Sequence, residues 1–273
     1  MPRRMTQWGV VGVTLVALVA APSCGTAAGA ESDGTAGATT VAPPDPQLLL
    51  TFDDQEPGSA VGRDIQGEGS AAAEVSLLGL GKQKAAFGKG RQGSIALRMP
   101  AYSGTAGGSF SALRIEPEEW LSPGLSDFTF GADIKLDALS NGTAIDNGDN
   151  VMQRGLYADA AQYKIQVDKH HASCVVRGAD GAVVVKSKAL LNPSKWYRLT
   201  CHRSDKTVKL MVQDLDSIQQ PEATEKTGPI GSLDMIGSEP LSVGAKIGDD
   251  GEIIGSSTDQ FNGWLDNISY ERT

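Results

Sequence analysis

Two cysteines and two histidines offer the first candidate chemistry in the chain. Cys174 and Cys201 lie in segments with a strand-like pattern, and each has a histidine nearby, His171 and His202 respectively. These residue types leave open a disulfide, a zinc site or a pair of free thiols. Neighbouring residues of a strand point to opposite faces, so His202 diverges from Cys201 and zinc is disfavoured. The disulfide is the favoured prediction, because the export signal described below would place both cysteines in an oxidising compartment.

Acidic residues follow the first apolar segment of the predicted domain. Leu48–Phe52 leads directly into Asp53 and Asp54, and Asp266 follows an apolar residue near the other end of the chain. If the first and last strands lie side by side, these carboxylates meet, and Ca²⁺ takes six to eight oxygen ligands of this kind. We predict one structural Ca²⁺ held by Asp53, Asp54 and Asp266. The alternatives are that these acids cap strand ends in water, or that Asp266 accepts hydrogen bonds from backbone amides.

The acids do not form a recognisable catalytic set. Cleavage of a glycan needs two carboxylates on one face, whereas the acidic run Glu116–Glu119 is interrupted by Pro117. The sequence has no Gly-x-Ser-x-Gly turn, no zinc-binding helix motif and no phosphate-binding loop. We therefore predict that the protein is not an enzyme.

The charge of the chain argues against one class of partner. The sequence has 24 Lys and Arg against 33 Asp and Glu, a formal net charge of −9. No basic stripe interrupts this acidic composition. Such a surface repels phosphate backbones, so nucleic acid is not an expected partner.

The first 30 residues have the pattern of a secretory signal peptide. Two arginines precede an apolar run at residues 10–21, which is too short to span a bilayer, and Ala28-Gly29-Ala30 offers a cleavage site. We predict a secreted protein without a membrane span. The segment before Cys24 also resembles a lipobox, so a membrane-anchored lipoprotein with a lipid on Cys24 is the alternative.

The rest of the chain divides into a spacer and one domain. Residues 31–45 are rich in Gly, Ala, Thr and Pro and predict a flexible spacer, which leaves residues 46–273 as the domain. The segments DFTFGADIKLD (127–137) and QYKIQVD (162–168) alternate apolar and polar residues, as half-buried strands do. About a dozen such strands without a convincing helix predict an all-β fold, a sandwich of two antiparallel sheets.

Several segments, in order, resemble the laminin-G-like domains of bacterial secreted proteins. They are GKGRQGSIALRMP (88–100), LSPGLSDFTFGADIKL (121–136), NVMQRG (150–155), YKIQVD (163–168), SCVVRG (173–178), KWYRLTCHR (195–203), LSVGAKIG (241–248) and DQFNGWLDN (259–267). The chain departs from the family pattern at Ser194-Lys195 and at Gln213–Asp216. The resemblance covers residues 48–270.

The resemblance implies a concanavalin A-like jelly roll of two curved antiparallel sheets. The two strand cysteines of the family match Cys174 and Cys201, which strengthens the disulfide prediction. Calcium recurs in laminin G and related sandwiches, which agrees with the predicted Ca²⁺. Relatives with this sandwich that cleave glycans have a pair of strand carboxylates that this chain lacks.

The resemblance also implies a recognition module, because the concave sheet of such sandwiches commonly contacts sugar or protein. The polar residues Gln153, Arg154, Lys164 and Gln166 on the matched strands are the candidate ligand-binding set. Trp120, beside a Pro-Gly turn, is a candidate for stacking on a sugar ring. We predict binding of a polysaccharide, with a structural or protein-binding module of the cell envelope as the alternative. The alternative for Gln153, Arg154, Lys164 and Gln166 is that they lie on a solvent-exposed sheet face with no ligand.

Overall fold

The computed structural model describes residues 45–101, 108–140, 147–235 and 239–273. The chain separates into two compact units, and the described residues all belong to the second, Pro43–Thr273. The predicted signal peptide, Cys24 and all but the last residue of the predicted spacer lie outside the described residues. Within the described ranges, no helix has the length and apolar character needed to cross a membrane.

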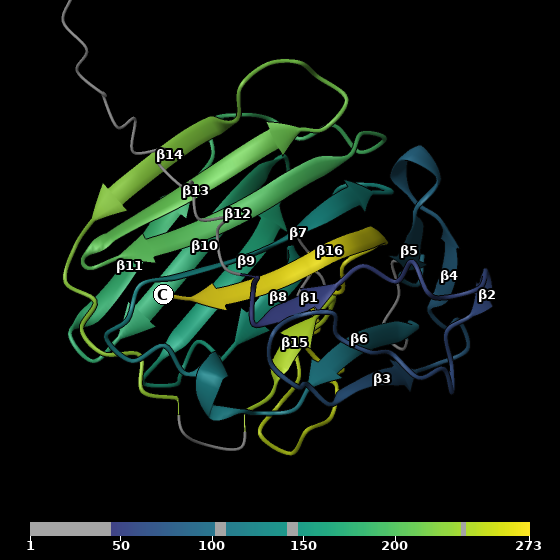
Figure 1. Cartoon of the computed structure of the whole chain (residues 1–273), viewed down its shortest axis with the longest axis horizontal. Helices are drawn as coiled ribbons and strands as arrows, with labels where there is room; N and C mark the ends of the chain where they lie inside the picture. Colours follow the sequence, from purple (N-terminus) through teal and green to yellow (C-terminus); the bar gives the residue numbers. More distant parts are fainter. Residues whose placement is uncertain (1–44, 102–107, 141–146, 236–238) are drawn as a thin grey trace, which may run out of the picture. The chain divides into compact units, whose positions relative to one another are not determined.

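Two antiparallel sheets, one lying over the other, make up the domain (Figure 1). The first sheet has nine strands, and β1 pairs with β16 beside the main path. In spatial order its strands are β14 (Glu222–Thr227), β13 (Thr207–Asp214), β12 (Tyr197–Ser204), β7 (Phe128–Leu136), β16 (Gly263–Arg272), β5 (Ile95–Arg98), β4 (Ala86–Lys89) and β2 (Gly58–Ser59), with β1 (Leu48–Leu50) on β16.

The second sheet has seven strands and lies behind the first in the view of Figure 1. Its spatial order is β11 (Gly181–Lys186), β10 (His171–Gly178), β9 (Gln162–Asp168), β8 (Asp149–Arg154), β15 (Leu241–Val243), β6 (Phe110–Ile115) and β3 (Val75–Leu80). Two short 3-10 turns, η1 (Arg91–Gly93) and η2 (Glu119–Leu121), are the helical elements of the described residues. The predicted all-β sandwich is confirmed.

The alternation of apolar residues places the core between the sheets. In β7 the apolar residues of the predicted face, from Phe128 to Leu136, are at most 2% exposed. The rings of Phe128, Phe130, Tyr163 and Tyr270 meet there, with centroids 5.0–6.0 Å apart. These ring contacts join the two sheets, because Tyr163 belongs to the second sheet and the other three rings to the first.

A disulfide joins the two sheets through this core. Cys174 on β10 is bonded to Cys201 on β12, with their Cα atoms 6.1 Å apart, within the normal range. The disulfide prediction is confirmed. The zinc alternative fails, since both sulfurs are bonded to each other and the His171 and His202 rings contact Ser187 and Thr129.

Candidate functional site

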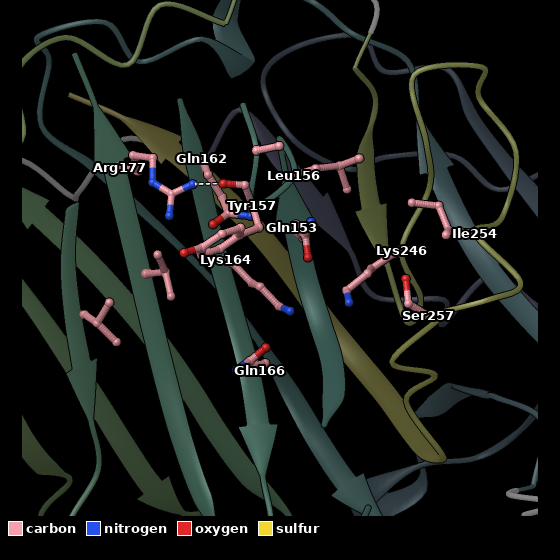
Figure 2. A pocket seen from close by; sticks show the side chains of 13 residues that line it. Gln153, Leu156, Tyr157, Gln162, Lys164, Gln166, Arg177, Lys246, Ile254 and Ser257 are labelled. Atoms are coloured by element: carbon pink, nitrogen blue, oxygen red, sulfur yellow. Dashed lines mark hydrogen bonds between the residues drawn. The ribbon is translucent and has the colours of Figure 1, made fainter. Parts of the chain in front are cut away.

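A pocket of about 470 Å³ lies on the outer face of the second sheet (Figure 2). Strands β8, β9, β10 and β11 form its floor, and two loops form its walls. It is lined by Gln153, Leu156, Tyr157, Ala158, Gln162, Lys164, Gln166, Val175, Arg177, Val184, Lys246, Ile254 and Ser257. Its size falls within the usual range of small-molecule sites.

The two-residue period of the strands positions the floor residues. Tyr163, Ile165 and Val167 of β9 point into the core and are fully buried. Lys164 and Gln166 must then point outward, into the pocket. In the antiparallel register Gln153 of β8 lies opposite Lys164, which brings their side chains together.

The loop of residues 245–258 covers part of the same sheet face and forms one wall. Its Ala245, Ile247 and Ile253 pack with Leu78 and Ala112, from the outward faces of β3 and β6. This small apolar cluster holds the loop against the sheet. Lys246, which lies between two of its members, is thereby turned toward the pocket floor (Figure 2).

Two lysines and one aspartate form the charged centre of the pocket. Asp259 Oδ2 lies 2.5 Å from Lys246 Nζ and 3.5 Å from Lys164 Nζ. Burial lowers the pKa of Lys164 to about 8; the Lys246 charge adds to this shift, and Asp259 opposes it. The amine of Lys164 is therefore the least well compensated charge of the three.

Several buried polar atoms around this centre have no hydrogen-bond partner within the described part of the chain. They are Gln153 Oε1, Asp259 Oδ1 and both side-chain atoms of Asn150. The amide nitrogens of Gln153 and Gln162 both donate to the carbonyl of Gly155, at 2.8 and 3.0 Å. Figure 2 shows the oxygen of Gln153 and the two lysine amines directed toward the same space. Buried polar groups normally have partners, so this space suits a polar ligand or water.

An exposed aromatic ring stands at the mouth of the pocket. Tyr157 is 84% exposed, and the guanidinium carbon of Arg177 lies 4.8 Å from its ring centroid. The loop that carries Tyr157 begins at Gly155, whose positive φ of 75° favours glycine. Sequence reasoning missed Tyr157; its signal is an aromatic residue among small and polar residues after a strand.

Two of the predicted ligand-binding residues do not line this pocket. Arg154 is 1% exposed and donates to the carbonyl oxygens of Met235 and Glu239 on the inner side. Trp120 is partly buried and packs on Tyr270 with ring centroids 6.0 Å apart. Of the predicted set, the structure brings together Gln153, Lys164 and Gln166. Arg154 differs from Gln153 because adjacent strand residues face opposite ways.

The first and last strands do lie side by side, as the metal prediction requires. β1 pairs with β16 over Leu48–Leu50, which brings the segment after β1 close to Asp266. However, protein donors already contact these acids: Ile95 N donates to Asp53, while Ser94 Oγ and Asn267 N donate to Asp266. Asp54 is exposed and contacts Gln55. A Ca²⁺ site at Asp53, Asp54 and Asp266 stays a prediction.

Asp266 has an unusual electrostatic environment. Burial raises its pKa to about 6, and the nearby charges of Asp133 and Asp53 add to the rise, while the hydrogen bonds from Ser94 and Asn267 oppose it. Asp133 is itself 4% exposed and is held by Arg198, at 2.7 and 2.8 Å. A cation near Asp53 and Asp266 would relieve this repulsion.

A second group of three acidic residues in the described ranges has its carboxylates close enough together to hold a metal ion. Asp159, Glu239 and Asp249 each place a carboxylate oxygen within 4.8 Å of the others. These residues come from the β8–β9 loop, the segment before β15 and the 245–258 loop. Three carboxylates fit a hard divalent cation, with carbonyl or water oxygens as further ligands.

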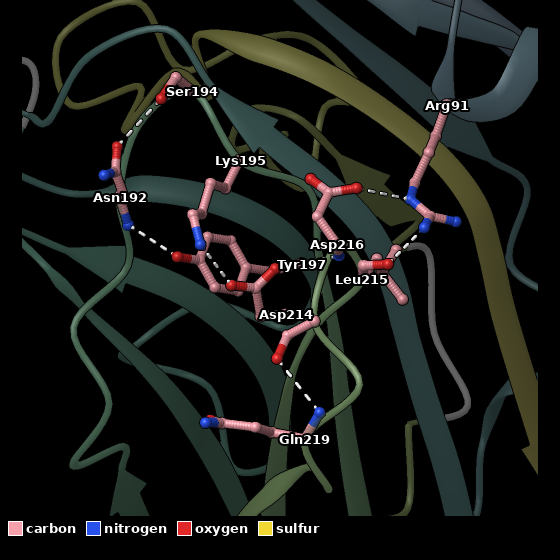
Figure 3. Close-up of polar contacts among 10 residues, drawn as sticks. Arg91, Asn192, Ser194, Lys195, Tyr197, Asp214, Leu215, Asp216 and Gln219 are labelled. Carbon is pink, nitrogen blue, oxygen red and sulfur yellow. Dashed lines mark hydrogen bonds and ion pairs between the residues drawn. The ribbon is translucent and has the colours of Figure 1, made fainter.

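The two segments that depart from the family pattern form a separate polar cluster (Figure 3). Lys195 Nζ lies 2.7 Å from Asp214 Oδ2, and this contact lowers the pKa of Asp214. Arg91 of η1 lies 3.0 Å from Asp216. The cluster ties the two segments to each other and to η1, and these exposed pairs contribute little to stability.

Comparison with known proteins identifies the fold. Residues 149–273 match the family model described as Laminin G domain. No curated protein matches the sequence. The binding domain of Paraclostridial Mosquitocidal Protein 1 superposes with a TM-score of 0.55 at 11% identity, over 84% of this chain and 49% of that chain.

Two botulinum neurotoxin structures are similar at the level of fold. The first is botulinum neurotoxin type C, whose cell entry is described as dependent upon interaction with two ganglioside molecules. The other is the binding domain of neurotoxin DC in complex with rat synaptotagmin II. Each has a TM-score of 0.51 at 8% identity, over 84% of this chain and 49% of the other. The chain thus spans about half the length of these structures. The family match over residues 149–273 and the sheet topology confirm the predicted resemblance: the domain is a jelly roll of two antiparallel sheets that is similar to laminin G domains.

Proposed function

We propose that the protein is an exported, non-catalytic recognition module that binds carbohydrate in the pocket on the second sheet. The observation that carries this proposal is the combination of polar floor and aromatic mouth. Gln153, Gln166 and Lys164 offer hydrogen bonds to hydroxyl groups, and Tyr157 offers an exposed face to a sugar ring. Apolar side chains such as Val175 and Ile254 complete the lining.

Export rests on the signal-peptide pattern of residues 1–30, with release as the proposal and a lipid on Cys24 as the alternative. The fold relatives described above include toxin binding domains, and one of them is described with gangliosides. That description concerns the neurotoxin and serves here only to motivate a carbohydrate test.

A glycan array followed by calorimetric titration of the hits tests the proposal. Tyr157→Ala should weaken sugar binding about tenfold, which corresponds to a loss of about 1.4 kcal/mol. Leu125→Ala is the matched control, because Leu125 is 73% exposed and lies outside the pocket. Thermal unfolding should be unchanged in both variants.

A saturable protein partner from an envelope extract, with no affinity for any glycan, would favour the structural or protein-binding alternative. Equal effects of Tyr157→Ala and Leu125→Ala on sugar binding would place the site elsewhere on the domain. Release of reducing sugar that one Asp or Glu substitution abolishes would overturn the non-catalytic assignment.

A further inference from the structure

The charge of the pocket is opposite to that of the chain. The full sequence has a formal net charge of −9. Among the described residues that line the pocket, none is acidic, whereas Lys164, Lys246 and Arg177 are all cationic. The acid Asp259 lies behind the two lysines and is 2% exposed. The pocket is thus a basic site on an acidic protein, and its field favours an anionic ligand.

The two lysines share one carboxylate, so one positive charge remains uncompensated. Lys246 takes the short contact with Asp259 Oδ2, at 2.5 Å. The 3.5 Å separation of Lys164 Nζ from the same oxygen exceeds the usual hydrogen-bond range. Lys164 is nevertheless only 7% exposed, so water solvates its amine poorly. Lys164 therefore shares its one carboxylate partner, Asp259, with Lys246, and a second anion would complete the compensation of the two ammonium groups.

We propose that the pocket selects an acidic sugar whose carboxylate is held between the ammonium groups of Lys164 and Lys246. This inference rests on the proposed carbohydrate-binding function. The sugar ring then extends toward Tyr157, and one of its hydroxyls donates to the unpartnered Oε1 of Gln153. An acidic peptide is the competing ligand and is included in the test below.

The coupling to protons follows from the burial of Lys164. The charged groups that act on its amine are Asp259 and Lys246, and their opposed effects together with burial hold its pKa near 8 in the free protein. A bound carboxylate favours the ammonium form and therefore raises this pKa. Binding then takes up a proton at pH above about 8, and affinity falls as the pH rises.

The test compares tri-galacturonate with its methyl ester by calorimetric titration of the purified chain between pH 6.5 and 9. The acid should bind at least tenfold more tightly than the ester at pH 7. Its affinity should fall about tenfold between pH 7 and pH 9, because the ammonium fraction of a group titrating near pH 8 falls by that factor. Buffers with different ionisation enthalpies should show proton uptake at pH 8.5.

Three variants separate the lysines from general electrostatics. Lys246→Gln should remove the preference for the acid, and Lys164→Gln should remove both the preference and its pH dependence. Lys89→Gln is the control, because Lys89 is exposed on β4 of the other sheet. Thermal unfolding verifies that each variant is folded. If Lys164→Gln does not fold, the sugar preference of Lys246→Gln and the proton uptake of the parent chain test the inference without it.

The outcomes are distinguishable from those of the proposed function. Equal binding of acid and ester overturns this inference and leaves carbohydrate binding intact. An equal loss in Lys89→Gln and Lys246→Gln overturns it in favour of unspecific attraction. Tight binding of tetraglutamate with no binding of either sugar overturns this inference and leaves the carbohydrate proposal to the glycan array. Failure of every glycan on the array overturns both.

Discussion

Removing the bond between Cys174 and Cys201 should cost the domain about 3.5 kcal/mol of stability. The bond closes a loop with a sequence separation of 27 residues. The loop-entropy relation gives about 12 cal/mol/K for this length, or about 3.5 kcal/mol at 25 °C. Both cysteines are fully buried, and the bond joins opposite sheets. For a domain of this size the midpoint of thermal unfolding should fall by about 7–14 °C.

Circular dichroism melts of the oxidised and the reduced chain measure this difference, because reduction breaks the bond between the sulfurs and only adds one hydrogen to each of them. The melting midpoints of Cys174→Ala, Cys201→Ala and the double variant should each fall by a similar amount, because losing either cysteine breaks the same bond. Thiol labelling of the unreduced, denatured chain should modify neither residue. A reduced chain that melts within about 2 °C of the oxidised one would refute the entropic reasoning.

Three further predictions concern the charged residues of the first sheet and the metal sites. Arg198→Gln should cost about 2–3 kcal/mol in urea unfolding, because it leaves buried Asp133 without its cation, and Asp133→Asn in the same chain should recover part of the loss. The native pKa of Asp266, near 6, exceeds the unfolded value of about 3.9, so protonation of Asp266 stabilises the folded state as the pH falls from 7 toward 4. The Asp266→Asn variant should lack this gain in stability. Identical profiles of stability against pH for the parent chain and the variant would contradict the prediction. The melting midpoint should be higher with excess Ca²⁺ than with chelator. At a Ca²⁺ concentration a hundred times its Kd, binding adds about 2.7 kcal/mol to the free energy of unfolding. Loss of that shift in Asp266→Asn supports the site at the strand ends, loss in Asp249→Asn supports the site with Asp159, and no shift in the parent chain excludes both.

The strand pattern was sufficient to predict the fold and part of the site. The two-residue period in QYKIQVD assigns Tyr163 and Ile165 to the core, and it assigns Lys164 and Gln166 to the opposite face. The same rule separates Gln153 from Arg154, although both were predicted to contact ligand. Trp120 packs on Tyr270, because large aromatic side chains are mostly buried. The exposed aromatic ring at the pocket is that of Tyr157.

The remaining part of the site depends on contacts that the sequence pattern does not encode. Lys246 reaches the pocket, with Asp259 behind it, because the 245–258 loop folds back over the sheet on Ile247 and Ile253. That packing joins residues far apart in the chain, such as Ala112 and Ile247, and no local period predicts it. Asp259 also adopts a positive φ of 46°, a conformation that its sequence context does not require.

The outer face of the second sheet has an apolar part that is covered and a polar part that is open to ligand. The 245–258 loop buries the apolar part of the outer face over β3 and β6, where Leu78 and Ala112 would otherwise be exposed. The polar part, over β8 to β10, stays open and keeps its hydrogen-bonding groups available. Because the core lies on the other side of these strands and Gln166 is half-buried at the pocket floor, a substitution at Gln166 should alter ligand contacts with little effect on packing. Stability and recognition can therefore be varied separately in this domain.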